Sequence, residues 1–146
     1  MKKLIPLFLV FALLCGCVST QIDATNTVTI EAVHEDGRVL LKPTQVPLPD
    51  GASVFEALTI AAKEQGVVLA FDGSKPNRYV EGIGGLFAFS EGELSGWLYY
   101  VNGESPTVGA DQYEIQDGDE YRFLFVTPFF LNRSSARFLV IFERNT

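Results

Sequence analysis

The sequence predicts a small α+β domain in which one mixed β-sheet carries one packed helix. Three observations lead to this fold class. Runs that alternate apolar and polar residues, typical of half-buried strands, lie on both sides of a single segment with helical periodicity. Strands and helices do not alternate along the chain as they do in doubly wound folds. A chain of 146 residues is also about the size of one domain once a targeting segment is removed.

The domain is predicted to open with a β-hairpin. The stretch "TVTIEAV" (residues 27–33) alternates apolar and polar positions and is rich in β-branched residues, as a half-buried strand is. "HEDG" (34–37) consists of turn-forming residues, and "RVLLKPTQV" (38–46) is the returning strand. We therefore expect the fold to begin near Val28.

The clearest helix lies in "SVFEALTIAAKEQG" (residues 53–66). Ser53 is a suitable N-cap, and Glu56 three residues later completes a capping box. Gly66 is expected to end the helix because it follows the last periodic residue. The apolar residues share one stripe at helical spacing, made of Val54, Phe55, Leu58, Ala61 and Ala62.

Four more segments are predicted as strands after the helix. They are a short buried strand at "VVLAF" (67–71), a strand running into glycines at "RYVEGIGG" (78–85), a strand entering a tight turn at "GWLYYVNGE" (96–104) and a last strand at "EYRFLFVTPF" (120–129). The segments between them are rich in Gly, Ser, Pro and Asp, which favour turns and loops. We expect these strands to complete the single sheet.

The N-terminus has the features of an export signal. Lys2 and Lys3 precede an apolar run over residues 4–14 that is too short to span a membrane. The following "LCGC" (14–17) is similar to the lipobox of bacterial lipoproteins, which predicts that Cys17 becomes the acylated first residue of the mature chain, with a palmitate-bearing anchor. The alternative is a plain signal peptide in which both cysteines are ordinary apolar residues.

These signals divide the chain into four parts. Residues 1–16 are the predicted lipoprotein signal peptide, 17–27 a polar tether, 28–128 the domain and 129–146 a C-terminal extension. The extension contains the apolar run "RFLVIF" (137–142), which is expected to form an extra edge strand, a dimer contact or a poorly packed segment. The predicted location is extracytoplasmic, with the protein attached to a bacterial membrane by its lipid.

Cysteine and histidine contents argue against an enzyme or a metalloprotein. Cys15 and Cys17 are the only cysteines and both precede the domain, so the domain has no disulfide, thiolate metal site or cysteine nucleophile. His34 is the only histidine and falls in the predicted hairpin turn, where we expect a surface residue. Carboxylates crowd residues 111–120, but their spacing does not match a calcium loop and "DGD" is a common turn sequence. We therefore expect no catalytic residue, no metal and no required cofactor.

The charge of the chain makes nucleic acid an unexpected partner. The formal net charge is −7, and removal of Lys2 and Lys3 with the signal lowers it to −9. An acidic protein is repelled by a phosphate backbone. The acidic residues are spread along the chain, as on the surface of a soluble extracytoplasmic domain.

The strand "WLYYV" (97–101) is the main candidate for a binding surface. Alternation places Trp97, Tyr99 and Val101 on one face and Leu98 and Tyr100 on the other. Large residues on both faces indicate a strand that is covered on both sides or one whose face lines a cleft. Strand patterning alone favours a core position for Trp97, because core aromatics outnumber those in ligand sites.

A family resemblance adds to this interpretation. The stretch from "YVEGIGG" (79–85) through "GWLYYVNGESP" to "DGDEYRFLFV" resembles the C-terminal domain of transcobalamin and intrinsic factor, and more so its bacterial versions on secreted proteins and lipoproteins. The opening "GASVFEAL" of the helix resembles the same family, and the match spans residues 28–126. The residues that carry it are Tyr79, Val80, Ile83, Gly84, Trp97, Asn102, Gly103, Pro106, Gly109, Tyr113, Asp117, Gly118 and Asp119.

The resemblance implies a β-grasp-like fold and a non-covalent ligand. In the vertebrate carriers this domain closes over one face of cobalamin while a separate helical barrel holds the other face. This chain has no such barrel, so a partner protein or a second copy would have to complete the site. The ligand-binding residues implied by the resemblance are Tyr79, Ile83, Gly84, Phe87, Trp97, Asn102, Pro106 and Val108. "VNGE" and "DGDEYRFL" are also similar to turns of ubiquitin-like sulfur carriers, but the chain lacks their terminal Gly-Gly.

The resulting expectation is a membrane-anchored extracytoplasmic lipoprotein that binds a ligand, with cobalamin or another corrinoid as the leading candidate. Cobalt ligation by His34 is not expected. The alternative is a cell-surface protein-interaction module without a small-molecule ligand. The position of Trp97 distinguishes the two, because a tryptophan exposed in a cleft favours a ligand and one buried without an adjoining cavity argues against it.

Overall fold

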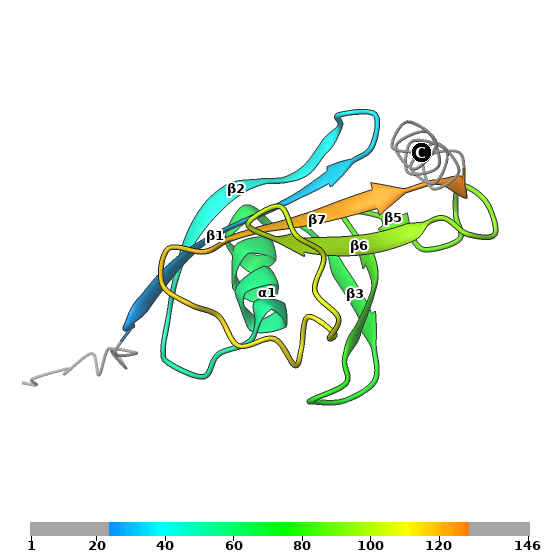
Figure 1. Cartoon of the computed structure of the whole chain (residues 1–146). Coiled ribbons are helices and arrows are strands. Elements are labelled where there is room, and N and C mark those ends of the chain that lie inside the picture. The colour runs from blue at the N-terminus through cyan, green and yellow to red at the C-terminus, as the bar shows by residue number, and fades with distance from the viewer. Residues whose placement is uncertain (1–23, 129–146) are drawn as a thin grey trace, which may run out of the picture.

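The computed structural model describes residues 24–128 (Figure 1). The predicted signal peptide, Cys17, most of the tether and the 129–146 extension lie outside this range. The elements are β1 (Asn26–His34), β2 (Val39–Leu48), α1 (Val54–Gln65), β3 (Leu69–Asp72), β4 (Tyr79–Ile83), β5 (Leu86–Phe87), β6 (Gly96–Val101) and β7 (Glu120–Val126). Between residues 24 and 128, no helix has the length and apolar character needed to cross a membrane.

The strands form two sheets, and the α+β class is confirmed. Four strands make a mixed sheet in the order β2-β1-β7-β6, in which β1 and β7 are parallel and the other pairs antiparallel. A second, antiparallel sheet has the order β3-β4-β5. The sequence had suggested one sheet. The second arises because Gly84 and Gly85 take positive φ angles of 61° and 84°, so the chain turns back at once and β4 pairs with β5.

The mixed sheet has the β-grasp outline. The β1–β2 hairpin is followed by α1, and the last strand then inserts beside β1 in the middle of the sheet. The parallel register runs from Thr29 opposite Glu120 to His34 opposite Phe125. The helix lies against one face of the mixed sheet, whereas no described element covers the other face (Figure 1).

The helix begins and ends at the predicted residues. The Ser53 hydroxyl accepts a hydrogen bond from the Glu56 backbone N–H, and the Glu56 carboxylate accepts one from the Ser53 N–H, which is a complete capping box. Gly66 ends the helix in the left-handed conformation with a φ of 66°. The predicted apolar stripe is buried, which places α1 firmly against the sheet.

Alternate residues of β7 form the centre of the core. Tyr121, Phe123 and Phe125 point toward the helix side and are almost completely buried. Burying a phenylalanine side chain contributes about 1.5–3 kcal/mol. Phe125 contacts two further aromatic rings in the core. Trp97 packs edge-on against it at 5.2 Å, and the His34 ring stacks on it at 5.5 Å, both measured between ring centroids.

Three local details differ from the sequence expectations. The first strand begins at Asn26, inside the predicted tether. The "VVLAF" strand is not buried, since Val68 and Phe71 are exposed at the edge of the small sheet. His34 was expected on the surface but is only 5% exposed, because the last residue of β1 still faces the core and stacks on Phe125.

Replacing Ser53 with alanine is expected to lower the free energy of unfolding by about 1–2 kcal/mol, because the capping hydroxyl is lost. Urea unfolding followed by circular dichroism measures the change. Thr59→Ala, on the exposed side of the same helix, is the matched control and is expected to change stability by less than about 0.5 kcal/mol. Equal destabilisation of the two variants would contradict the capping role.

Candidate functional site

Trp97 is a core residue, which corrects its proposed role as a ligand wall. Its side chain is only 8% exposed, and it lines neither of the two cavities described below. The indole Nε1 donates a hydrogen bond to the carbonyl oxygen of Leu86 at 3.1 Å. Because β6 turns this face toward the core, the ring packs on Phe125 and has no face free for a flat ligand.

Tyr99 lies two residues further along the same face of β6. Its hydroxyl donates a hydrogen bond to the carbonyl oxygen of Val108 at 2.6 Å. Its ring stacks on Phe123 and meets Tyr113 edge-on. Burial raises the pKa of Tyr99 to about 12, so the hydroxyl stays protonated and keeps donating at physiological pH. Tyr99 therefore fastens the loop after β6 to the strand.

Trp97 and Tyr99 together hold two exposed segments beside β6. Trp97 binds β5 through Leu86, and Tyr99 binds the loop at Val108. Three of the candidate residues on these segments and on the adjoining β4 are well exposed: Tyr79 at 52%, Phe87 at 46% and Val108 at 42%. We call these three residues the rim.

The rim is shaped by a glycine in β4. A Cβ at Gly82 would lie 2.8 Å from the Phe87 ring, so this ring can cover the strand only where a side chain is absent. A bulge in β4 keeps both Val80 and Ile83 buried and leaves Tyr79 on the outer side with Phe87. The small sheet thus presents the rings of Tyr79 and Phe87 to solvent on this outer side.

The other candidate residues have structural positions. Ile83 is completely buried, and Gly84 forms the turn between β4 and β5. Asn102 takes a positive φ of 49° in the turn after β6, and its side chain donates to Asp119 and accepts from the Glu120 backbone N–H. Pro106 is half-buried in the loop. Ile83 therefore supports the surface from below, whereas Gly84 and Asn102 are exposed turn residues.

A buried ion pair that the sequence did not suggest positions the rim. The Asp111 carboxylate accepts hydrogen bonds from the backbone N–H and Nε of Arg78, each at 3.0 Å. The guanidinium also lies 4.2 Å above the Phe55 ring. This pair joins the loop that carries Val108 to the residue before Tyr79. The Arg78 hydrogen bonds lower the pKa of Asp111, which therefore stays ionised.

His34 is engaged in a different ionic cluster. Its Nε2 lies 3.0 Å from Glu91 Oε2, and its Nδ1 accepts a hydrogen bond from the Asp36 backbone N–H. Nε2 is accordingly the donor to Glu91, which leaves neither ring nitrogen free for a metal. In residues 24–128 no group of three or more His, Cys, Asp or Glu side chains is arranged to hold a metal ion.

Three of the five carboxylates of residues 111–120, those of Asp111, Asp117 and Asp119, are bound to the chain itself. Asp117 accepts a hydrogen bond from the Thr27 backbone N–H at 2.7 Å. Asp119 accepts one from the Tyr121 hydroxyl at 2.9 Å. These contacts tie the turn before β7 to β1 and to the core, as expected for a structural turn.

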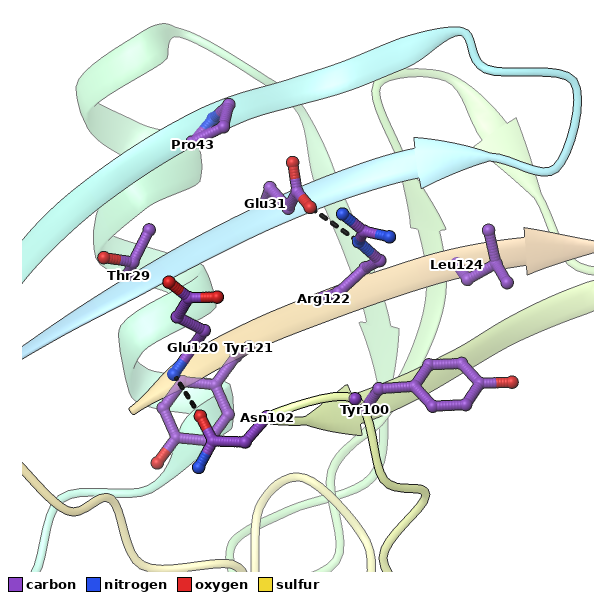
Figure 2. Close-up of a pocket in the computed structure, with 10 residues that line it drawn as sticks. Thr29, Glu31, Pro43, Tyr100, Asn102, Glu120, Tyr121, Arg122 and Leu124 are labelled. Carbon is purple, nitrogen blue, oxygen red and sulfur yellow. Dashed lines mark hydrogen bonds and ion pairs between the residues drawn. The ribbon is translucent and has the colours of Figure 1, made fainter. Parts of the chain in front are cut away.

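A cavity of about 770 Å³ opens on the uncovered face of the mixed sheet (Figure 2). Its wall combines an aromatic ring, Tyr100, with a pair of charges in which Arg122 Nε donates to Glu31 at 2.6 Å. The complete lining is Thr29, Glu31, Pro43, Tyr100, Asn102, Gly103, Glu120, Tyr121, Arg122 and Leu124. Of the candidate residues, only Asn102 belongs to it. Sequence alternation placed Tyr100 and Trp97 on different faces of β6, but it could not show which of the two faces lacks a cover.

A smaller cavity of about 450 Å³ lies beside the start of α1. Its charged residues are Asp50, Glu56, Lys75 and Arg78, and Lys75 is paired with Glu56 at 2.9 Å. No candidate ligand-binding residue lines it.

A comparison with known protein families found one matching family. Residues 51–127, just over half of the chain, match a domain of unknown function, DUF4430. The chain belongs to the DUF4430 family. A search of curated proteins found no match to this DUF4430 protein.

Two solved structures are similar to the DUF4430 chain. Haptocorrin, crystallised in complex with Cbi, has a TM-score of 0.57 and 17% identity over 76% of this chain and 28% of haptocorrin. A candidate metal-binding protein from Ruminococcus gnavus ATCC 29149 has a TM-score of 0.48 and 15% identity over 69% of this chain and 96% of its own length. At these identities the haptocorrin similarity shows a shared fold, consistent with the transcobalamin-like C-terminal fold.

Asp111→Asn is expected to destabilise the domain by about 3 kcal/mol at pH 7, because Arg78 loses its buried counter-charge. The native pKa of Asp111 lies below its unfolded value, so the ion pair stabilises fully above about pH 4 and less as the pH falls through the native pKa. The stability difference from wild type should therefore shrink in acid. Urea unfolding at pH 7 and pH 3 measures it.

Asp72→Asn provides the matched control for this pH dependence. Asp72 is exposed, and its replacement should change stability by less than about 0.5 kcal/mol at pH 7. A deficit in Asp111→Asn that was equally large at pH 7 and pH 3 would show that the ion pair is not its cause.

Proposed function

We propose that this protein is an exported, lipid-anchored ligand-binding module and that its ligand is cobalamin or another corrinoid, bound without a covalent bond. The fold shared with haptocorrin, which was crystallised with Cbi, supports the choice of ligand. The lipobox at Cys17 supports the extracytoplasmic, membrane-anchored location. No catalytic role is proposed.

The observation that carries this proposal is the rim. Trp97 and Tyr99 fasten β5 and the loop to the same face of β6, so Phe87 and Val108 are held by rigid contacts although both are exposed. Exposed apolar side chains on a supported surface are typical of binding sites. In this arrangement Trp97 supports the surface and does not touch the ligand.

The proposed mechanism is capture of one face of a flat ring. A corrin presents an apolar ring with polar amide substituents. The ring would lie on the side chains of the rim, and the backbone groups near Gly84 would pair with the amides. The rim is an open surface, so it would cover one side of the ring. A partner protein or a second copy of this chain is therefore proposed to cover the other side.

Titration with cobalamin and with cobinamide tests the ligand. The chain from Val18 to Thr146 is suitable, because every described element lies between Asn26 and Val126. Calorimetry is expected to show saturable binding with a Kd of about 50 µM or tighter. A bound corrin should also quench the emission of Trp97, which lies beside the rim. No saturable heat with either compound would reject corrinoid binding by this chain alone.

Val108→Asp, in the rim, is expected to weaken corrinoid binding at least about tenfold, because it places a charge against an apolar ring. Val68→Asp is the matched control, since Val68 is also exposed but lies beside β3. It is expected to leave the Kd unchanged. Equal loss in both variants would place the ligand elsewhere.

A protein-interaction module is the second candidate, and two observations favour it. The first is that Trp97 is buried and lines neither cavity, which by the criterion set from the sequence argues against a small ligand. The second concerns Phe89. Phe89 is exposed and holds a positive φ of 65°, a conformation that costs a bulky residue about 1 kcal/mol or more. Strained, exposed aromatics of this kind concentrate at binding surfaces. Leu94, five residues further along the chain, is exposed to the same extent as Phe89, at 68%. Absence of corrinoid binding would favour this candidate.

Cys17→Ser is expected to abolish incorporation of labelled palmitate and to release the protein from the membrane fraction. Cys15→Ser is the matched control, because Cys15 lies in the segment that cleavage removes, and it should keep both label and membrane attachment. Labelling followed by fractionation measures the outcome. Membrane attachment that persists in Cys17→Ser without label would contradict a lipid anchor at this residue.

A further inference from the structure

The uncovered face of the mixed sheet carries several apolar side chains. Leu98, at 39% exposure, and Tyr100 point outward from β6, and Leu124 points outward from the neighbouring β7. Leu98 is directly opposite Leu124 in the register. Tyr100, Leu124 and Pro43 of β2 line the 770 Å³ cavity (Figure 2). We call this surface the open face.

The chain leaves the fold at the end of the open face. Thr127, the residue after β7, is fixed by hydrogen bonds from its backbone N–H and hydroxyl to the Glu35 carboxylate. The segment 129–146 therefore starts a few residues beyond Leu124. Eighteen residues can extend about 60 Å, whereas the seven residues of β7 span about 23 Å. The segment is long enough to turn and cross the whole face.

The segment and the described domain have opposite charges. Arg133, Arg137 and Arg144 with Glu143 give residues 129–146 a formal charge of +2. Residues 24–128 contain sixteen Asp or Glu and six Lys or Arg, a formal charge of −10. The open face itself carries Glu31 and Glu120, and only Glu31 is paired with Arg122 there.

The segment also contains an apolar run that needs cover in water. "FLVIF" (138–142) is flanked by Arg137 and Glu143. A run of this kind left in solvent is an aggregation hazard. The open face offers the apolar side chains of Leu98, Tyr100 and Leu124 together with the carboxylate of Glu120, so it matches the segment in both respects.

We propose that residues 129–146 fold back over the open face, so that the 138–142 run covers Leu98, Tyr100 and Leu124 and the arginines pair with carboxylates at its edge. This surface is separate from the rim, because alternate residues of β6 point to opposite sides of the sheet. A second copy of the domain is a poorer occupant, since two faces of a −10 domain repel each other.

Disulfide trapping tests this docking. The chain from Val18 to Thr146 contains no cysteine, so pairs can be introduced cleanly. Leu98→Cys combined with Val140→Cys is expected to form an intramolecular disulfide in a glutathione buffer at least about tenfold faster than the control pair. The control is Val68→Cys with Val140→Cys, because Val68 is exposed beside β3 and away from the open face. Non-reducing electrophoresis and mass spectrometry measure the products.

Each outcome of the trapping experiment is decisive. Equal rates for the two pairs would overturn the proposal. A disulfide that forms only between two chains, at a rate that rises with concentration, would overturn it in favour of a second copy on this face. Arg137→Glu with Arg144→Glu should slow the intramolecular disulfide, whereas an unchanged rate would remove the electrostatic part of the argument.

Amide spectra provide a second measurement that needs no cysteine. Deleting residues 129–146 is expected to shift the NMR signals of Leu98, Tyr100 and Leu124 and to leave those of Phe87 and Val108 in place. Adding a peptide of residues 129–146 to the shortened chain should reverse the shifts. Unchanged open-face signals would overturn the proposal. Corrinoid titration of the shortened chain tests the rim separately, because that chain retains all three rim residues.

Discussion

The parallel pairing of β7 with β1 is the interaction on which the rest of the structure depends. It inserts the last strand into the middle of the mixed sheet and aligns Phe125 with His34. From this position Phe125 contacts both Trp97 and His34, so β6 and the β1–β2 turn are packed on one side chain. Asp117 and Asp119, which begin the turn into β7, are likewise bound to β1 and to the core.

The same sheet gives β6 two roles. Its inward residues Trp97 and Tyr99 hold the segments that carry the rim, and its outward residues Leu98 and Tyr100 form part of the open face. A strand with large side chains on both faces was the main feature of the sequence. In the structure, the inward side chains support the rim, and the outward side chains are part of the open face.

Local signals in the sequence were sufficient to predict the helix and most strands. The Ser53–Glu56 capping box and Gly66 act within one helical turn, and alternation gives strand faces directly. Alternation could not show which face of β6 is covered, because that depends on where the helix packs. Arg78 and Asp111 are 33 residues apart and His34 and Glu91 are 57 apart, so no local pattern predicts either contact. The buried position of Trp97 followed from strand patterning, whereas the family resemblance alone placed it at a ligand.

The position of β7 has a consequence for biosynthesis. A chain synthesised from its N-terminus completes β1 first, and β1 lacks its neighbour β7 until the residues after 119 have been made. The Glu31–Arg122 contact, for example, joins residues 91 positions apart. Closing so long a loop is slow compared with forming a hairpin or a helix. The hairpin and α1 would therefore wait with their apolar faces exposed, and chaperones and proteases would meet this protein as an incomplete sheet.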